Sequence, residues 1–156
     1  ANGIKVGVIN LLGRTFMRYN VTCPFLGLDE ALKSLNPLTK IIILDMHAET
    51  TSEKVAIGHY ANGRLSGVVG THTHIQTADE KILSQGTAYI TDLGMSGPYD
   101  SVIGQDKDKI IKRFITSMPV KFEVATMDTK ICGVVINIDE QTGRATQIVR
   151  LQRPGG

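Results

Sequence analysis

The order of apolar and polar positions predicts alternating strands and helices in the first half of the chain. Residues 4–10 alternate and then continue apolar, which is typical of a strand. Residues 28–35 place apolar side chains at the i, i+3, i+4, i+7 spacing of a helix, and Pro37 ends that helix. The aliphatic run 41–45 then predicts a buried central strand.

The same alternation of elements continues toward the middle of the chain. Thr50 and Glu53 have the spacing of a capping box, which predicts a helix that begins there and ends at 62–63, an Asn-Gly pair. Two short aliphatic runs, 65–70 and 88–92, predict further strands. Strand, helix and strand in this order indicate a crossover between parallel strands.

The last third of the chain has a different pattern. Residues 106–117 carry an apolar stripe at helical spacing, and alternation begins at 120–124. The runs 131–138 and 145–151 flank 139–143, a five-residue segment typical of a hairpin turn. We therefore expect a mixed α/β (α+β) fold in which an early parallel sheet is joined by a late antiparallel one.

Composition and charge narrow the class of protein. With 156 residues, 42% apolar and 21% charged, the chain has the size and composition of one globular domain. No apolar run reaches the roughly 18–20 residues of a membrane span, and a net charge of +2 gives no strong signal for nucleic acid. Two cysteines suit a reducing compartment, so we expect a cytoplasmic protein. We expect residues 153–156 to form a disordered tail.

Three of the four histidines follow predicted strands. His47 comes after the strand that ends at Asp45, and His72 and His74 come after the strand that ends at Gly70. If these strands are parallel, their carboxyl ends meet at one edge, where α/β sheets bind ligands. In an extended backbone a His-x-His pair puts both rings on one side, so three imidazoles could converge on a metal ion. The alternative is that each histidine only makes a structural hydrogen bond.

Other polar residues lie near the same edge. Asp45, Glu49 and Asp92 are candidates to orient ligating imidazoles, which usually donate their second N–H to an acceptor. The alternatives are that Glu49 favours the following helix terminus and that Asp92 caps a turn. Arg14 follows the first strand and is a candidate to bind phosphate. The alternative is that Arg14 is an ordinary solvated surface arginine. His59 has no histidine companion and is interpreted as a surface residue.

Four sequence blocks recur in order in one known family. They are Val8–Phe16, Asp45–Lys54, Val68–Glu80 and Ala88–Pro98. Together they resemble the bacterial YmdB-like branch of the calcineurin-like metallophosphoesterases, whose members act as 2',3'-cyclic-nucleotide 2'-phosphodiesterases. The resemblance extends over nearly the whole chain.

The resemblance implies a four-layer α/β/β/α sandwich with a two-metal centre. By that likeness His47 and His72 would bind one ion and His74 would bind the other, with iron or manganese as the expected metals and zinc as a third option. In such centres two metal ions activate a hydroxide for in-line attack on phosphorus. A small-molecule phosphodiester is then the expected substrate.

The chain also departs from the family pattern. Family members begin with a strand ending in Gly-Asp, followed by Glu-Asn and Gly-Asn-His motifs, and none of these occurs here. We therefore expect residues 1–152 to be the C-terminal portion of one metallophosphoesterase domain whose N-terminal strands are missing. The leaving-group histidine is expected in that missing segment, which would be a required partner. An apolar strand edge left unpaired would favour a homo-oligomer.

Two other functions remain open at the level of sequence. One is a metal-binding or assembly module without catalysis. The other is a mononuclear metallohydrolase, since three imidazoles can hold one ion with an open fourth position. The Asp45–Glu49 and Thr91–Met95 segments weigh against the mononuclear alternative because they match the YmdB-like branch instead.

Overall fold

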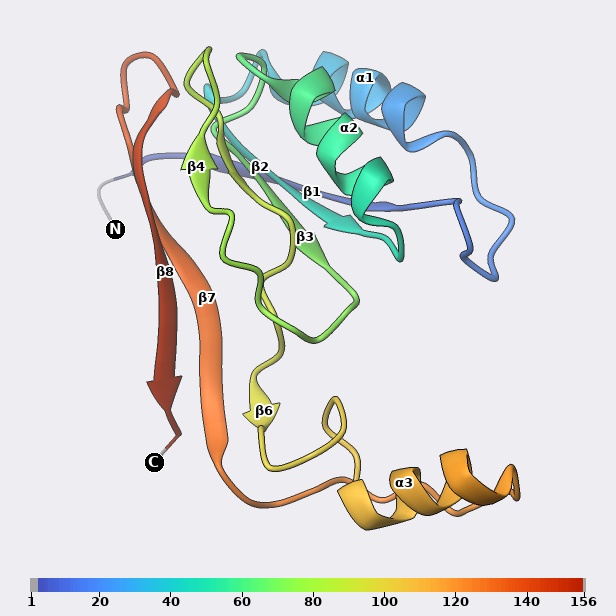
Figure 1. The fold of residues 1–156 in the computed structure, drawn as a ribbon. Coiled ribbons are helices and arrows are strands. Elements are labelled where there is room, and N and C mark those ends of the chain that lie inside the picture. The colour runs from blue at the N-terminus through green and yellow to red at the C-terminus, as the bar shows by residue number, and fades with distance from the viewer. Residues whose placement is uncertain (1–2, 156) are drawn as a thin grey trace.

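A computed structural model describes residues 3–155 and arranges them as two sheets with helices (Figure 1). The helices are α1 (Pro24–Leu35), α2 (Thr51–Ala61) and α3 (Lys107–Thr116). The strands are β1 (Val6–Leu12), β2 (Ile41–His47), β3 (Gly67–Thr71), β4 (Lys81–Ile82), β5 (Ala88–Ile90), β6 (Gly97–Pro98), β7 (Thr129–Ile138) and β8 (Ala145–Pro154).

The first sheet has the strand order β1-β2-β3-β5-β4. All of its neighbouring strands are parallel except β4, which is antiparallel to β5. Leu12 pairs with His47, and His47 pairs with Thr71, so three strands end at the same edge. The parallel crossover expected from the sequence is therefore confirmed, and it brings the segments that follow β1, β2 and β3 together.

Helices α1 and α2 cover one face of the first sheet (Figure 1). Leu28 and Leu32 of α1 and Ile57 of α2 are buried in one cluster with Ile42 and Leu44 of β2. The apolar stripe of α1 and the aliphatic run of β2 thus meet, because burying both removes apolar surface from water. This cluster is the core of the molecule.

The second sheet is antiparallel, with the order β6-β7-β8, and lies against the other face. Gly67 of β3 lies close to Ile136 of β7. A Cβ atom added to Gly67 would be 3.2 Å from the Cδ1 atom of Ile136. The result is a mixed α/β fold, as predicted. Of the four layers expected, the described residues form an α/β/β stack, and Figure 1 shows α3 beyond the end of the second sheet rather than covering it.

Several element boundaries differ from the sequence prediction. Helix α1 begins at Pro24, four residues early, because proline's fixed φ suits the first helical position. Residues 120–124 do not form a strand, although Val124 makes an isolated bridge with Gln105. The expected disordered tail also differs: Arg153 and Pro154 belong to β8. Gly156, the last residue of that tail, lies outside the described residues.

The edge of the first sheet at β1 is apolar and uncovered. Val6 is 55% exposed and Val8 is 71% exposed, on the face that β7 and β8 leave open. An exposed apolar edge strand is a template for pairing with another chain. Within the described residues, no helix is long and apolar enough to cross a membrane.

Candidate metal centre

The loop after β3 carries two of the predicted site histidines in an unusual backbone conformation. His72 has φ +107° and His74 has φ +68°, both in the left-handed region that residues other than glycine seldom adopt. The expectation that both rings share one side of an extended strand is therefore wrong. The strand ends at Thr71, and the amide of Thr73 turns away to donate to Asp92 Oδ2 at 3.0 Å.

Two of the three histidines come together at the sheet edge. His47 Nε2 lies 3.1 Å from His72 Nδ1, and the two rings meet edge to face with centroids 4.8 Å apart. His74 lies apart from them and donates from Nδ1 to the carbonyl of Ile103 at 3.0 Å. Among residues 3–155, no three His, Cys, Asp or Glu side chains form a group close enough to hold one metal ion.

The neighbours of His47 fix which of its ring nitrogens carries the proton. Thr71 donates its hydroxyl hydrogen to Asp45 Oδ1 at 2.7 Å, so its oxygen is left to accept from His47 Nδ1–H at 3.1 Å. Asn10 donates to the other oxygen of Asp45 at 2.8 Å. Burial lowers the pKa of His47, and the neighbouring His72 lowers it further. A neutral His47 therefore presents the lone pair of Nε2.

His72 faces His47 through its Nδ1 atom. Its Nε2 lies 2.7 Å from Glu49 Oε2, and because a carboxylate only accepts, Nε2 carries the hydrogen. In a neutral ring Nδ1 then has a lone pair directed at the lone pair of His47 Nε2, whereas in an imidazolium it carries a hydrogen directed there. Two such nitrogens at 3.1 Å repel each other unless a cation, either a proton or a metal ion, lies between them.

The spacing of the His47 and His72 nitrogens matches that of two ligands of one metal ion. Two Zn–N bonds of about 2.1 Å at a tetrahedral angle place the nitrogens roughly 3.4 Å apart, close to the observed separation. Asp45, through Thr71, and Glu49 supply the acceptors that ligating imidazoles usually have. His74 also has an acceptor for its second nitrogen, because Nδ1 donates to the carbonyl of Ile103 and leaves Nε2 free of protein partners in the described part of the chain.

Asp92 supports the loop rather than a histidine ring. It is fully buried and forms an ion pair with buried Lys54 at 2.7 Å, while accepting the amides of Thr73 and Gly94. Burial raises the pKa of the Asp92 carboxyl, but hydrogen bonds from Lys54, Gly94 and Thr73 outweigh it and leave the pKa below its ordinary value. Asp92 thus holds the backbone between His72 and His74 in place.

Sequence reasoning missed Lys54 as a functional residue. The signal was present: Lys54, Ile57, Gly58 and Ala61 are all buried and follow helical spacing, so the lysine stands on the apolar face of α2. A charged residue at such a position needs a buried partner, since an unpaired charge in an apolar interior is costly. The partner is 38 residues away and could not be named from local pattern.

A second residue missed is Glu53. Its carboxylate accepts the amides of Arg14 at 3.0 Å and Thr15 at 3.3 Å instead of closing the predicted capping box, and Thr50 makes no side-chain cap. Glu53 therefore fixes the loop after β1 beside the site, where the amide of Gly13 also donates to the carbonyl of His47. The Arg14 side chain is exposed, and its phosphate-binding role stays a prediction.

Comparisons with known proteins bear on this site. A family model described as YmdB-like protein matches residues 1–151. The chain belongs to the YmdB-like protein family. A curated relative, the 2',3'-cyclic-nucleotide 2'-phosphodiesterase of Bacillus subtilis strain 168, is 55% identical over 151 residues, which are 97% of this chain and 57% of the relative.

Two solved structures share the fold. A hypothetical protein from Thermus thermophilus has a TM-score of 0.87 and 35% identity, over 96% of this chain and 57% of its own. A novel phosphatase from Mycoplasma pneumoniae also has a TM-score of 0.87 and 35% identity, over 94% of this chain and 52% of its own. The chain therefore spans just over half the length of the relatives it matches.

Proposed function

We propose that this chain forms part of a metal-dependent phosphodiesterase that hydrolyses 2',3'-cyclic nucleotides or related phosphodiesters. The observation that carries the proposal is the approach of two imidazole nitrogens, His47 Nε2 and His72 Nδ1, which lie 3.1 Å apart. The Bacillus subtilis relative, named as a phosphodiesterase, supports the reaction class. Two ions, iron or manganese or else zinc, would supply a hydroxide at neutral pH and stabilise charge on the phosphoryl oxygens.

The residues of this chain have distinct roles in the proposal. His47 and His72 hold one ion, and His74, which faces Ile103 with its other nitrogen, is a ligand of the second. Asp45, acting through Thr71, and Glu49 keep the rings in the required tautomers. Arg14, on the loop that Glu53 anchors, binds the substrate phosphate.

Completion of the site needs more than these residues. A two-metal centre requires a bridging carboxylate, and we propose that a segment beyond this chain supplies it together with the leaving-group acid. The lengths of the relatives are consistent with such a segment, since this chain covers 57% of the Bacillus subtilis protein. We also propose a cytoplasmic location, which the two free cysteines, Cys23 and Cys132, support.

Metal titration of the purified chain tests the ligand set. We expect Mn²⁺ binding, followed by calorimetry, to weaken at least tenfold in His72→Ala, because that substitution removes one ligating nitrogen. His59→Ala is the matched control, since His59 is exposed on α2 away from the pair. Equal Mn²⁺ affinity in wild type, His72→Ala and His59→Ala would contradict the proposal.

An activity assay separates the proposal from the alternatives. In a longer protein containing this segment, we expect His72→Ala to abolish hydrolysis of adenosine 2',3'-cyclic phosphate while His59→Ala retains it. A non-catalytic binding or assembly module predicts no hydrolysis even in the unsubstituted protein. A mononuclear metallohydrolase predicts activity with one ion per chain, which elemental analysis measures.

A further inference from the structure

A cavity of about 320 Å³ lies at the amino ends of the strands, the opposite end of the first sheet from the histidines. The turns that precede β2, β3, β5 and β8 all contribute to its lining. Lys40 lines it, and the seven residues of β2 place His47 roughly 20 Å away along the strand. The cavity is therefore distinct from the proposed metal centre.

Among the described residues that line the cavity, three are basic and none is acidic: Lys40, Arg64 and Arg144. Lys40 Nζ donates to the carbonyl of Gln141 at 2.7 Å, which leaves two of its three N–H groups. Arg64 pairs with Asp29 through one nitrogen of its guanidinium. Arg144 forms no ion pair in the described part of the chain. All three cations therefore retain hydrogen-bond donors for a ligand.

One further carboxylate lies near these cations, outside the lining. Asp139 accepts the amide and the hydroxyl of Thr142, both at 2.7 Å, and these hydrogen bonds lower the pKa of its carboxyl below the ordinary value. The charge of Lys40 lowers that pKa further. Asp139 and Asp29 together balance two of the three positive charges. One positive charge is left, so the cavity favours an anion.

Close packing holds the walls of the cavity in place. The stem of Arg144 packs on Gly86, where an added Cβ would lie 3.0 to 3.2 Å from three carbons of that stem. A Cβ on Gly143 would lie 2.2 Å from the carbonyl oxygen of Lys40, so the turns before β2 and β8 meet backbone to backbone. Buried Ser66 donates to the carbonyl of Gly143 at 2.6 Å. A ligand would therefore bind without ordering these turns, which lowers the entropic cost of binding.

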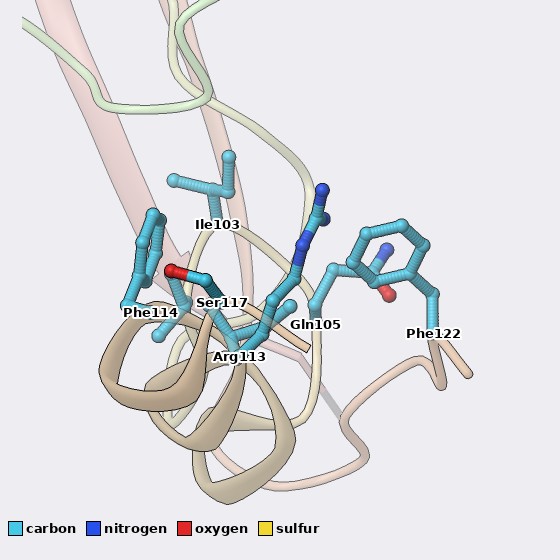
Figure 2. Close-up of a pocket in the computed structure, with 8 residues that line it drawn as sticks. Ile103, Gln105, Arg113, Phe114, Ser117 and Phe122 are labelled. Carbon is cyan, nitrogen blue, oxygen red and sulfur yellow. The ribbon is translucent and has the colours of Figure 1, made fainter. Parts of the chain in front are cut away.

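The larger cavity between α3 and the segment 102–105, about 630 Å³, has a different charge (Figure 2). Among the described residues that line it, Arg113 alone is basic, and its guanidinium lies 4.9 Å from the centre of the Phe122 ring. Arg113 is thus an arginine that lines a cavity without basic neighbours. It serves as an internal reference for the three cations at the other site.

We propose that the cavity at Lys40, Arg64 and Arg144 binds the phosphate group of a small ligand, either inorganic phosphate or a phosphomonoester. Guanidinium groups bond phosphate oxygens in pairs, and an ammonium adds a point charge. A tetrahedral phosphate has enough oxygens for donors from three separate turns, whereas a carboxylate has two in one plane. The volume is at the lower end of the range for small-molecule sites.

Titration of the 156-residue chain with inorganic phosphate, at constant ionic strength and with a chelator present, tests this site. We expect phosphate to shift the Nε–H signal of Arg144 saturably in nitrogen-resolved NMR and to leave that of Arg113 unchanged. Arg144→Met keeps the stem but removes the charge, and should weaken phosphate binding, followed at the Gly143 amide, about tenfold. Lys40→Met should weaken it as well. Arg153→Met removes an exposed arginine near the far end of β8 and should have no effect.

Two further ligands sharpen the test. Glycerol 3-phosphate distinguishes the two sources of the phosphate group: tighter binding than inorganic phosphate supports the site with an esterified ligand, and weaker binding supports it with free phosphate. Acetate should bind at least tenfold more weakly than phosphate. Equal affinity for acetate and phosphate, equal phosphate affinity in Arg144→Met and wild type, or no saturable shift of the Arg144 signal would overturn the proposal. The chelator removes metal ions, so these results do not depend on the metal centre.

Discussion

Helices α2 and α3 have nearly the same length but opposite surroundings. Helix α2 buries Lys54, Ile57 and other residues against the first sheet, while α3 buries Ile110 and leaves Phe114 78% exposed. Yet α3 has the clearer apolar stripe, and α2 interrupts its buried face with a lysine. The contrast teaches that apolar spacing predicts a helix, whereas chain topology decides whether that face is covered. Helix α2 is covered because it connects two parallel strands.

The two helices also differ in what their charges do. On α2, Lys54 is only 1% exposed and pairs with Asp92, which holds the loop that carries His72. On α3, Lys107 pairs with Asp100 at the surface, where both side chains are about half exposed. Surface pairs of this kind contribute little because water screens them, whereas a buried charge depends on its partner.

The largest expected effect comes from breaking the buried pair on α2. We expect Lys54→Met to lower the free energy of unfolding by about 3–5 kcal/mol, because it leaves the Asp92 carboxylate buried without its partner. Urea unfolding at neutral pH measures this. Lys112→Met, on the exposed face of α3, should stay within about 0.5 kcal/mol of wild type. Similar losses of unfolding free energy in both variants would show that the buried charge on α2 matters no more than an exposed charge on α3.

Acid should produce the next largest effect, again through α2. Because the pKa of Asp92 is held below its ordinary value of 3.8, the stabilisation is complete above that value and is lost as pH falls through the lowered pKa. We expect wild type to lose stability on acidification more steeply than Lys54→Met/Asp92→Asn, which retains an amide oxygen but carries neither charge. Parallel curves of unfolding free energy below about pH 5 would count against this account.

Two matched substitutions, each removing one methylene group from a side chain, sharpen the comparison of the two helices. Ile57→Val on α2 should cost about 1 kcal/mol, because Ile57 is fully buried and the lost methylene leaves a void. Ile115→Val on α3 should cost almost nothing, since Ile115 is 78% exposed. Thermal unfolding of the two variants under one buffer tests the difference. A larger loss for Ile115→Val would show that something covers α3 in solution.

The smallest effect on stability should come from Val8→Lys at the open edge of the first sheet. Val8 is 71% exposed, so the free energy of unfolding should change by less than about 0.5 kcal/mol. Self-association, measured by light scattering after size exclusion, should nevertheless decrease because a lysine discourages edge pairing. Phe114→Lys is the comparison. If Phe114→Lys makes the chain monomeric and Val8→Lys does not, α3 rather than β1 forms the contact between copies of the chain.

Local pattern was enough to predict much of the fold. The stripe at 28–35 and the run at 41–45 correspond to α1 and β2, and the parallel pairing of β2 with β3 followed from the crossover between them. The late hairpin was also predicted, as β7 and β8. Such elements are predictable because periodic burial leaves a mark on neighbouring residues.

The site was only partly predictable. His47 and His72 meet because two parallel strands end side by side, which the sequence implied. The position of His74 depends on positive φ values and on Asp92, which pulls Thr73 inward. These features arise from tertiary contacts, which local spacing does not encode.

The histidine loop is also tied to the second sheet. The side-chain amide of Gln76 donates to the carbonyls of Gly133 at 3.0 Å and Leu151 at 3.1 Å, one on β7 and one on β8. Local opening of residues 72–76 therefore has to break hydrogen bonds to both strands of the hairpin. Amide hydrogen exchange in this loop should thus follow sub-global opening rather than fast loop fraying. The exchange rate of the Thr73 amide, which donates to Asp92, then reports how often this anchored loop opens.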